Sequence, residues 1–482
     1  MRRPLILAAC MLAMFMAAIE ATIVATAIPT IVADLGGFAL FGWVFGAYLL
    51  AQAVSIPIYG RLADLYGRKQ VMFTGTAIFL VGSTLCGLAP SMLALILFRA
   101  VQGLGAGAIL PIASTIVGDI YTPAERARVQ GWLSSVWGFS AVVGPLLGAF
   151  IVTSLHWSVI FWVNLPIGVA AVAALAVFFP ETRQSRPRRI DYAGAVLMVL
   201  AVGLLMFALM QASTLGWWTF AILGASALAF TALAFQARTV AEPLLPFGLW
   251  RNRTILAGNL GCIAIGATMM GCSAFLPVYI QGVRGLPVLA GGTAVALMSI
   301  GWPLAATLGG RLMLVTSYRF NIILGGAILV VGAVILPLAM QGEGLFWIDI
   351  AAFIIGVGLG LGSSTFMVAV QSAADQPMRG IATASTVFAR MVGSALGTAI
   401  LGAVLNFGLA GRFGADPVQT LMDPPARAAL AAPDLARLSG AVDVALHHVF
   451  WVAAALAVLT FAIAFLTPGG LRPTNAVPAG RS

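Results

Sequence analysis

The chain has 482 residues, of which 61% are hydrophobic and only 8% are charged. An average soluble domain carries about 25% charged residues, so this sparse set cannot cover the surface of a soluble protein of this size. The composition excludes a soluble enzyme, a disordered chain and a secreted disulfide scaffold. Runs of about 20 apolar residues recur along the whole length and are typical of a polytopic membrane protein.

Fourteen hydrophobic spans follow one another, each long enough to cross about 30 Å of hydrocarbon as an α-helix. Their limits are 5–31, 39–60, 70–89, 92–117, 129–153, 158–179, 190–211, 217–237, 254–280, 287–309, 320–340, 346–370, 381–408 and 442–466. The start, Met1-Arg2-Arg3, resembles that of a signal peptide, but the first apolar run is longer than the usual 7–15 residues. We therefore expect a retained first helix in an all-α membrane protein with 14 transmembrane helices.

The 25 basic residues, which include a single lysine, Lys69, indicate the orientation of these spans. With the N-terminus in the cytoplasm, 19 of them fall in cytoplasmic tails, loops or helix ends, four fall outside, and Arg99 and Arg390 lie within spans. This distribution follows the positive-inside rule. We expect both termini in the cytoplasm, and we interpret the net charge of +10 as a topology signal rather than as affinity for nucleic acid.

An internal repeat indicates two similar halves. Gly60-Arg61-Leu62 after the second span recurs as Gly310-Arg311-Leu312 after the tenth, and the same offset of 250 residues maps Lys69 onto Arg319. Such a repeat is typical of a transporter with two six-helix bundles, here separated by two additional helices. The predicted domains are an N-terminal half at 1–180, a two-helix insert with linkers at 181–253, a C-terminal half at 254–470 and a cytoplasmic tail at 471–482.

The stretch Gly60–Lys69 reads GRLADLYGRK and connects the second and third spans. Its glycines permit a tight loop, and Asp64, Arg68 and Lys69 can form charge-assisted hydrogen bonds at the membrane surface. The stretch resembles the loop signature of the major facilitator superfamily. This resemblance implies the major facilitator fold and a cytoplasmic charge relay of Asp64, Arg68 and Asp119 that stabilises the outward-open state.

Two charged residues lie deep in the N-terminal half, where an ionisable side chain marks a functional site by default. Arg99, in the stretch Leu95–Gly105, resembles the arginine of the family's helix-4 motif, which is implicated in proton transfer. Burial favours the neutral form of Glu20, which suits a proton carrier. The stretch Glu20–Pro29 resembles the helix-1 signature of the fourteen-helix drug:H⁺ antiporter branch, which usually has Asp in place of Glu20. The alternative is structural pairing, of Arg99 with a carbonyl or with Glu20.

The fifth span contains Gly144, Pro145 and Gly148 in a spacing that resembles the family's antiporter motif. Ser140 and Ala149 replace two of its glycines, and both are small enough to keep close helix contact. Pro145 permits a bend because it lacks a backbone donor. The alternative is generic packing of small residues.

Five further residues form the predicted substrate cavity: Gln102, Trp137, Phe139, Phe275 and Arg390. Polarisable and aromatic side chains suit an adaptable cavity, and plain lipid or core packing is the alternative for each aromatic residue. Arg390 either pairs with an acidic group or an anionic part of a substrate, or it holds backbone carbonyls or extends toward the cytoplasmic side.

The resemblance covers nearly the whole chain and implies a proton-coupled antiporter that exports amphipathic, cationic or lipophilic small molecules by alternating access. The alternatives are an exporter of one specific metabolite, such as an antibiotic, fatty acid or siderophore, and a membrane receptor that has lost transport. No Walker motif, metal cluster or nucleophile constellation occurs, so we expect no enzyme and no cofactor, with a proton gradient as energy source. The expected partners are substrates, protons and membrane lipids, not nucleic acid, for a monomer in the bacterial cytoplasmic (inner) membrane.

Overall fold

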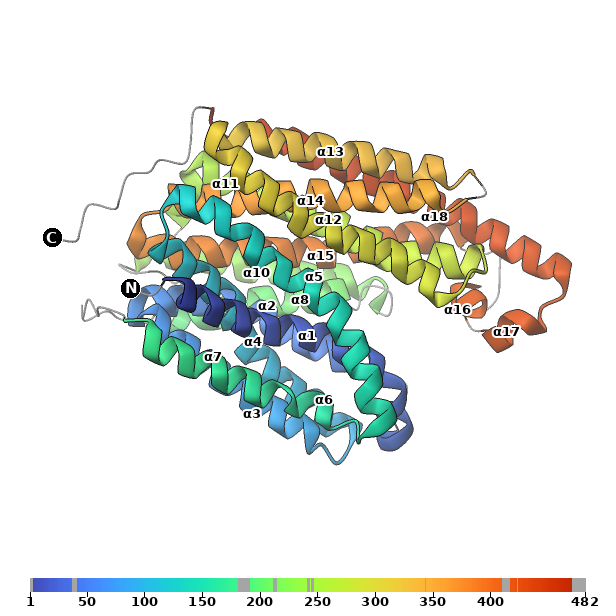
Figure 1. The fold of residues 1–482 in the computed structure, drawn as a ribbon, viewed down its shortest axis with the longest axis horizontal. Coiled ribbons are helices and arrows are strands. Elements are labelled where there is room, and N and C mark those ends of the chain that lie inside the picture. Colours follow the sequence, from blue (N-terminus) through green and yellow to red (C-terminus); the bar gives the residue numbers. More distant parts are fainter. Residues whose placement is uncertain are drawn as a thin grey trace. The chain divides into compact units, whose positions relative to one another are not determined.

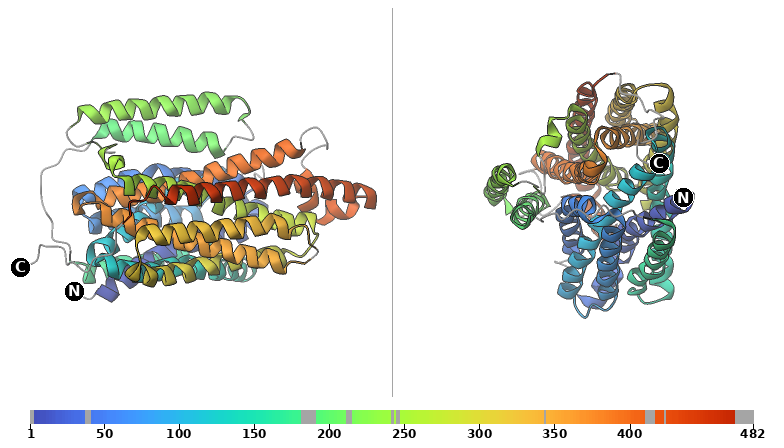
Figure 2. Two further views of the ribbon diagram at one scale, coloured as in Figure 1. Left: turned by 90° about the horizontal axis from the view of Figure 1, so that it is seen from above. Right: turned by 90° about the vertical axis from the view of Figure 1, so that its left-hand side faces the viewer.

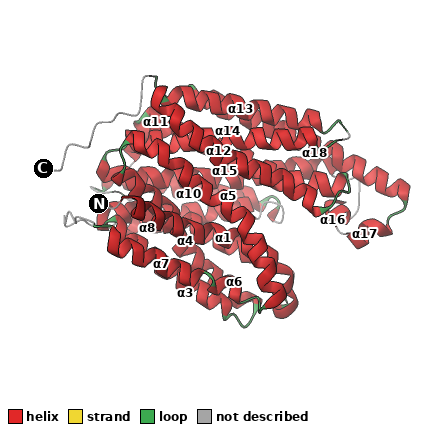
Figure 3. Cartoon of the chain, viewed as in Figure 1, coloured by secondary structure: helices red, strands yellow, loops and turns green. Residues whose placement is uncertain are grey.

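The computed structural model describes residues 3–36, 41–180, 191–210, 215–240, 243, 247–342, 344–409, 417–422 and 424–469. Within these residues every regular element is a helix, as Figure 3 shows. A helix satisfies its backbone N–H and C=O groups internally, and lipid offers these groups no other partner. The fold class therefore follows directly from the apolar composition.

The helices are labelled in chain order in Figure 1. The first part of the chain forms α1 (Arg3–Leu35), α2 (Phe41–Tyr66), α3 (Arg68–Gly87), α4 (Met92–Ile120), α5 (Pro123–Ser154), α6 (Val159–Trp162) and α7 (Asn164–Phe178). The next part forms α8 (Tyr192–Met210), α10 (Trp218–Thr239) and the short 3₁₀ helix η2 (Phe247–Arg251). The remainder forms α11 (Arg253–Pro277), the π-helix η3 (Val278–Val283), α12 (Val288–Val315), α13 (Tyr318–Ala339), α14 (Phe346–Ala373), η4 (Gln376–Met378), α15 (Arg379–Leu409), α16 (Pro417–Met422), α17 (Pro424–Ala429) and α18 (Ala432–Ala464).

The predicted spans coincide with long helices. Among the described residues, 13 helices are long and apolar enough to cross a membrane. The 32-residue α5 is a further long helix, and Thr122 and Glu125 form a capping box at its polar start. The sixth span is divided at Val163 into α6 and α7. The prediction of an all-α membrane protein with about 14 spanning helices is confirmed.

The chain divides into two compact units. The first unit contains Met1–Leu256 and Met367–Phe388, and the second contains Ala257–Phe366 and Ala389–Arg472. The helices α8 and α10 lie side by side (Figure 2) and belong to the first unit, where Phe207 stacks on Trp43 of α2 at 6.0 Å between ring centroids. The predicted limits of the two halves and the insert stay a prediction.

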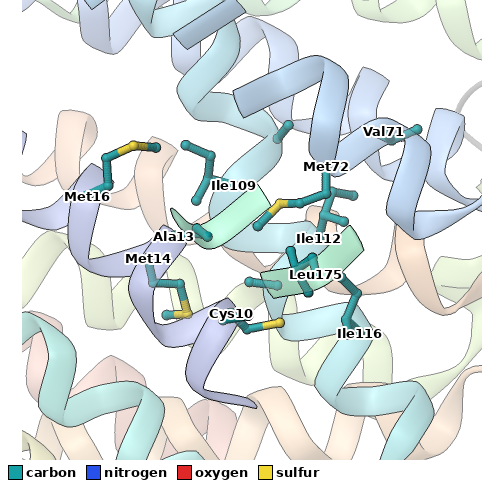
Figure 4. Close-up of a cluster of buried hydrophobic side chains, with 14 of the residues drawn as sticks. Cys10, Ala13, Met14, Met16, Val71, Met72, Ile109, Ile112, Ile116 and Leu175 are labelled. Carbon is teal, nitrogen blue, oxygen red and sulfur yellow. The ribbon is translucent and has the colours of Figure 1, made fainter. Parts of the chain in front are cut away.

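The first unit has two cores, which meet near the middle of α1. One core joins α1, α3, α4 and α7 through residues such as Cys10, Met72 and Leu175 (Figure 4). The other begins on α1 at Ile19 and Ile23, nearer the far end of that helix. Apolar packing on both sides isolates the intervening stretch of α1 from solvent, which makes a charge there costly unless it is paired.

Glycines allow α3 and α4 to approach until their backbones touch. A Cβ at Gly105 of α4 would meet the backbone of Phe79 and would lie 2.6 Å from the carbonyl oxygen of Gly75. Small residues at such crossings permit close van der Waals packing, which stabilises helix pairs in lipid. The positive φ of Gly67, 100°, similarly permits the one-residue turn between α2 and α3.

We expect Gly105→Ala to lower the free energy of unfolding by about 1–3 kcal/mol, because the added methyl group forces α3 and α4 apart. Gly224→Ala on α10 is the matched control, since a Cβ there would meet nothing within 4 Å. Thermal unfolding in detergent measures the difference. Equal midpoints for the two variants would contradict this account of the α3–α4 contact.

Candidate functional site

The middle of α1 carries a fully buried carboxylate. Along the axis of α1, Glu20 is separated from Arg3 by about 25 Å and from Leu35 by about 22 Å, at 1.5 Å per residue. Its side chain has no exposed surface. One carboxylate oxygen pairs with Nη1 of Arg99, and the other accepts a hydrogen bond from Nδ2 of Asn164. The acid on α1 is therefore bound to α4 and to the first residue of α7.

Arg99 has several partners although it is 1% exposed. Besides the carboxylate of Glu20, it donates from Nε to the carbonyl oxygen of Val44 at 3.0 Å and from Nη1 to Oε1 of Gln102 at 2.7 Å. The ring of Tyr48 lies 4.3 Å from Cζ, which allows a cation–π contact. Such partners offset the cost of moving a guanidinium out of water.

Three polar side chains complete this network. Gln102 donates from Nε2 to Oγ of Ser83 at 3.1 Å, and Asn164 donates to the same oxygen at 3.0 Å. The hydroxyl of Ser83 in turn donates to the carbonyl oxygen of Phe161 at 2.7 Å. The network therefore joins α1, α2, α3, α4, α6 and α7 through one chain of hydrogen bonds. We refer to Glu20, Arg99, Gln102, Ser83 and Asn164 as the buried network.

Glycines beside the network bring its members within reach of one another. A Cβ at Gly103 would meet the carbonyl oxygen of Tyr48, so that glycine lets α2 place the Tyr48 ring against Arg99. A Cβ at Gly82 would lie 2.6 Å from Cα of Gln102, and this close approach brings Ser83 to the Gln102 amide. The hydrogen bonds thus depend on backbone distances that larger residues would not permit.

The predicted antiporter motif packs against α1 near Glu20. A Cβ at Gly144 of α5 would meet the hydroxyl of Thr22, and Thr22 donates to the carbonyl oxygen of Ser140 at 3.1 Å. Gly148 is also buried, whereas the side chain of Pro145 lies outside the described residues. Displacement of α1 at Glu20 would therefore be transmitted to α5.

A second charged cluster lies at the ends of α2 and α4 that are predicted to face the cytoplasm. Nη2 of Arg68 lies 2.7 Å from Oδ1 of Asp64, and Nε of Arg68 lies 3.0 Å from Oδ2 of Asp119. Asp64 also accepts hydrogen bonds from the backbone N–H groups of Gly380 and Ile381, at 3.0 and 2.9 Å. The carboxylate thus caps the N-terminus of α15, where the helix dipole favours a negative charge.

Two residues that sequence reasoning missed belong to the same cluster. Nη1 of Arg379 binds Oδ1 of Asp119 at 2.6 Å, so Asp119 is shared between two arginines. Gln371 of α14 donates to the carbonyl oxygen of Ser114 on α4 at 3.0 Å. We refer to Asp64, Arg68, Asp119, Arg379 and Gln371 as the helix-end cluster, which ties α2 and α4 to α14 and α15 within the first unit.

Lys69 follows Arg68 in the sequence, but its Nζ contacts a different element. It donates to the carbonyl oxygens of Ala176 and Phe179 at 2.8 and 2.9 Å. Those carbonyls lie at the C-terminal end of α7, where unpaired acceptors favour a cation. One short sequence motif therefore supplies both an ion pair to α4 and a cap for α7.

The residues predicted to line a substrate cavity occupy different surroundings. Gln102 belongs to the buried network. Trp137 and Phe139 of α5 are exposed, and the Phe139 ring lies 5.6 Å from that of Phe15. Phe275 is buried in the second unit, which also contains Arg390. Their common cavity stays a prediction.

The structure also brings in residues that were not among the predicted site residues, namely Asn164, Ser83 and Tyr48. Their polar character inside apolar stretches was the available signal, since buried polar groups need partners. Among the described residues, no group of three or more His, Cys, Asp and Glu side chains could hold a metal ion.

We expect Arg99→Gln to lower the free energy of unfolding by about 3–5 kcal/mol, because Glu20 would keep a buried charge without its ion partner. The double variant Glu20→Gln with Arg99→Gln should lower the free energy of unfolding by less than Arg99→Gln alone. Arg3→Gln is the control, since the Arg3–Glu125 pair is 46% and 38% exposed and should contribute about 0–1 kcal/mol. Denaturant unfolding in mixed micelles measures the stability of all three variants. An equal loss of stability in Arg99→Gln and Arg3→Gln would refute the burial argument.

We expect Asp64→Asn to speed amide hydrogen exchange at Gly380 and Ile381, because the neutral amide accepts these hydrogen bonds less strongly and loses the ion pair with Arg68. Asp375→Asn is the matched control, since the Asp375 side chain is exposed and forms no capping hydrogen bond to η4. Exchange followed by mass spectrometry on peptides that span this region gives the readout. Unchanged protection in Asp64→Asn would show that α15 does not depend on this cap.

Comparison with known proteins identifies the family. The family model of the Major Facilitator Superfamily matches residues 10–398. Multidrug resistance protein 3 of Bacillus subtilis is 34% identical over 429 residues, covering 86% of this chain and 84% of the relative. Multidrug transporter protein MdtP of the same organism is 35% identical over 448 residues, covering 92% and 82%.

A solved structure shows the same fold at low sequence identity. The human organic anion transporter MFSD10 superposes with a TM-score of 0.69 and 13% identity, covering 96% of this chain and 100% of that one. At this identity the likeness concerns the fold alone. Together, the family match, the two similar relatives and the helical fold show an integral membrane transporter rather than an enzyme, and the chain belongs to the major facilitator superfamily.

Proposed function

We propose that this transporter is a proton-coupled antiporter that exports amphipathic, cationic or lipophilic small molecules by alternating access. The observation that carries the proposal is the position of Glu20, a carboxylate buried in the middle of a span and bound to Arg99 and Asn164. An ionisable group at this depth is expensive and marks an ion pathway by default. The names of the two similar bacterial proteins, a multidrug resistance protein and a multidrug transporter protein, support the export of drug-like compounds.

Protonation of Glu20 would change the buried network in a defined way. The neutral acid loses its ionic attraction to Arg99, which keeps two acceptors in Val44 and Gln102. The guanidinium therefore stays solvated by protein groups while α1 is released from α4. Because Gly144 packs on Thr22, movement of α1 also affects the predicted antiporter motif on α5.

In the proposed cycle, Glu20 releases its proton toward the cytoplasm and substrate binds. Protonation of Glu20 from the outside then expels the substrate, and the two halves rock back. The charge relay of Asp64, Arg68 and Asp119 stabilises the outward-open state in this scheme. Its contacts with the start of α15 support that role, since they hold helix ends together on the predicted cytoplasmic side.

The remaining parts of the proposal follow from the same scheme. The proton gradient supplies the energy and no cofactor takes part. The partners are small-molecule substrates, protons and membrane lipids, and nucleic acid is not among them. The protein acts as a monomer in the bacterial cytoplasmic membrane, with both termini on the cytoplasmic side, as the distribution of basic residues favours.

We expect Glu20→Gln to fold but to lose proton-driven efflux, because glutamine fills the same space without carrying a proton. Purified protein in liposomes with a pH gradient, and ethidium as a lipophilic cation, gives the readout as substrate-induced proton release. Glu125→Gln is the matched control, since Glu125 is an exposed acid outside the buried network. The control should couple like the wild type.

Full activity in Glu20→Gln would rule out this carboxylate as the proton carrier. Wild-type transport that does not change when the gradient is removed would indicate a uniporter instead. A panel of cations, zwitterions and neutral lipophiles extends the test to specificity. A response confined to one compound would indicate an exporter of a single metabolite.

A further inference from the structure

Arg390 is the second arginine inside a span, and it lies too deep to reach water along its own helix. Arg390 is separated from Arg379, the first residue of α15, by about 16 Å along the helix axis, at 1.5 Å per residue. An extended arginine side chain covers less than half of that distance, so its charge cannot extend to the helix end. The guanidinium must therefore be satisfied at its own depth.

The two arginines differ in their partners. Arg99 binds a carboxylate, a carbonyl oxygen and an amide oxygen. The guanidinium of Arg390 forms no hydrogen bond or ion pair with any residue that the structure describes. The ring of Trp302 lies 6.0 Å from its Cζ, and the thiol of Cys262 is also within electrostatic range. A guanidinium carries five N–H donors, and an unpaired one at this depth is strongly disfavoured.

Close helix packing fixes the position of both side chains within the second unit. A Cβ at Gly266 of α11 would meet the carbonyl oxygen of Arg390, and Oγ of Ser394 lies 3.3 Å from the carbonyl oxygen of Gly266. A Cβ at Gly360 of α14 would likewise meet the carbonyl oxygen of Trp302. Arg390 and Trp302 are thus held on packed helices, through the α11–α15 and α12–α14 contacts, rather than on a loop.

The place where these two residues meet is rich in donors and poor in acceptors. Trp302 is half-buried, and its indole N–H donates to no residue in the described part of the chain. The described acidic residues of the second unit lie elsewhere. Asp349 and Asp434 are in the first turns of α14 and α18, and Asp443 interacts with His447 and Arg284.

The acids of the first unit that lie deepest in spans are already paired with arginines of that unit. Glu20 binds Arg99, and Asp64 binds Arg68. The described residues therefore offer Arg390 no free carboxylate, and an anion bound from outside the chain is the chemistry that fits. A guanidinium binds a carboxylate through two parallel hydrogen bonds, and an indole adds apolar surface and one N–H donor.

We propose that Arg390 and Trp302 form an anion subsite in the second unit that binds the carboxylate of an aromatic amphiphile. This inference rests on the proposed export function, since it names the chemical class of a substrate group. It assigns the recognition of negative charge to α15 and α12, apart from the buried network on α1 and α4. Zwitterionic amphiphiles would then be accepted through their acidic end.

The test uses a pair of dyes that differ only in a free acid, rhodamine B and its ethyl ester. Fluorescence anisotropy measures the binding of each dye to the purified full-length protein in detergent, without any gradient. We expect Arg390→Gln to raise the Kd of rhodamine B by about tenfold or more, as for the loss of a charged hydrogen bond, and that of the ester by less than about twofold. Arg390→Lys should restore part of the loss, because it keeps the charge but not the bidentate geometry.

Arg437→Gln is the matched control, since Arg437 is exposed on α18 and its loss should leave both Kd values unchanged. Equal binding of the two dyes to the wild type, or equal weakening of both by Arg390→Gln, would overturn the subsite. If Arg390→Gln does not fold, a Lys variant that binds both dyes like the wild type would overturn it too. If the protein prefers the carboxylate dye through Arg390 but shows no gradient-driven efflux, the proton-coupled function would be refuted. The subsite would remain supported.

Discussion

The ion pair between Glu20 and Arg99 is the interaction on which the interior of the first unit depends. Neither charge reaches water, and each is tolerable only because the other lies against it. Further hydrogen bonds join Arg99 to Val44 and Gln102, and Glu20 to Asn164. Since these groups come from different helices, satisfying one charged pair fixes how α1, α2, α4 and α7 pack.

That network requires backbones that nearly touch, and small residues make this possible. Gly103 lets α2 approach α4 beside Arg99, and Gly82 lets α3 approach Gln102. Apolar burial alone would hold these helices only loosely, because lipid is as apolar as their side chains. The glycines and the charged pair are thus two parts of one arrangement, in which close packing sets the distances and the hydrogen bonds set the register.

The helix α4 connects the two charged clusters of the first unit. Arg99 and Asp119 lie on it about 30 Å apart, at 1.5 Å per residue, one in the buried network and the other in the helix-end cluster. A shift of α4 that accompanies a change at Glu20 would also move Asp119 relative to Arg68 and Arg379. This shared rigid element is a physical route by which a proton in the membrane interior could affect contacts at the helix ends.

The sequence by itself determined the approximate number and positions of the spans, because hydrocarbon forces every spanning segment into a long apolar helix. It also marked Glu20, Arg99, Asp64 and Arg68, since charges in such a chain are few and each needs a reason. Only the tertiary structure decided their partners. Nothing local in the sequence links Glu20 to Asn164, or Asp119 to Arg379, which lie 144 and 260 residues apart.

The same division applies to the two arginines that lie inside spans. In the sequence, Arg99 and Arg390 are alike, each a lone guanidinium inside a span. The structure separates them, because helix packing brings a carboxylate, a carbonyl and an amide to Arg99 but places the ring of Trp302 beside Arg390. Hydrophobicity selects the segments that enter the membrane, whereas the close contacts between distant helices decide which buried charge is satisfied by the chain itself.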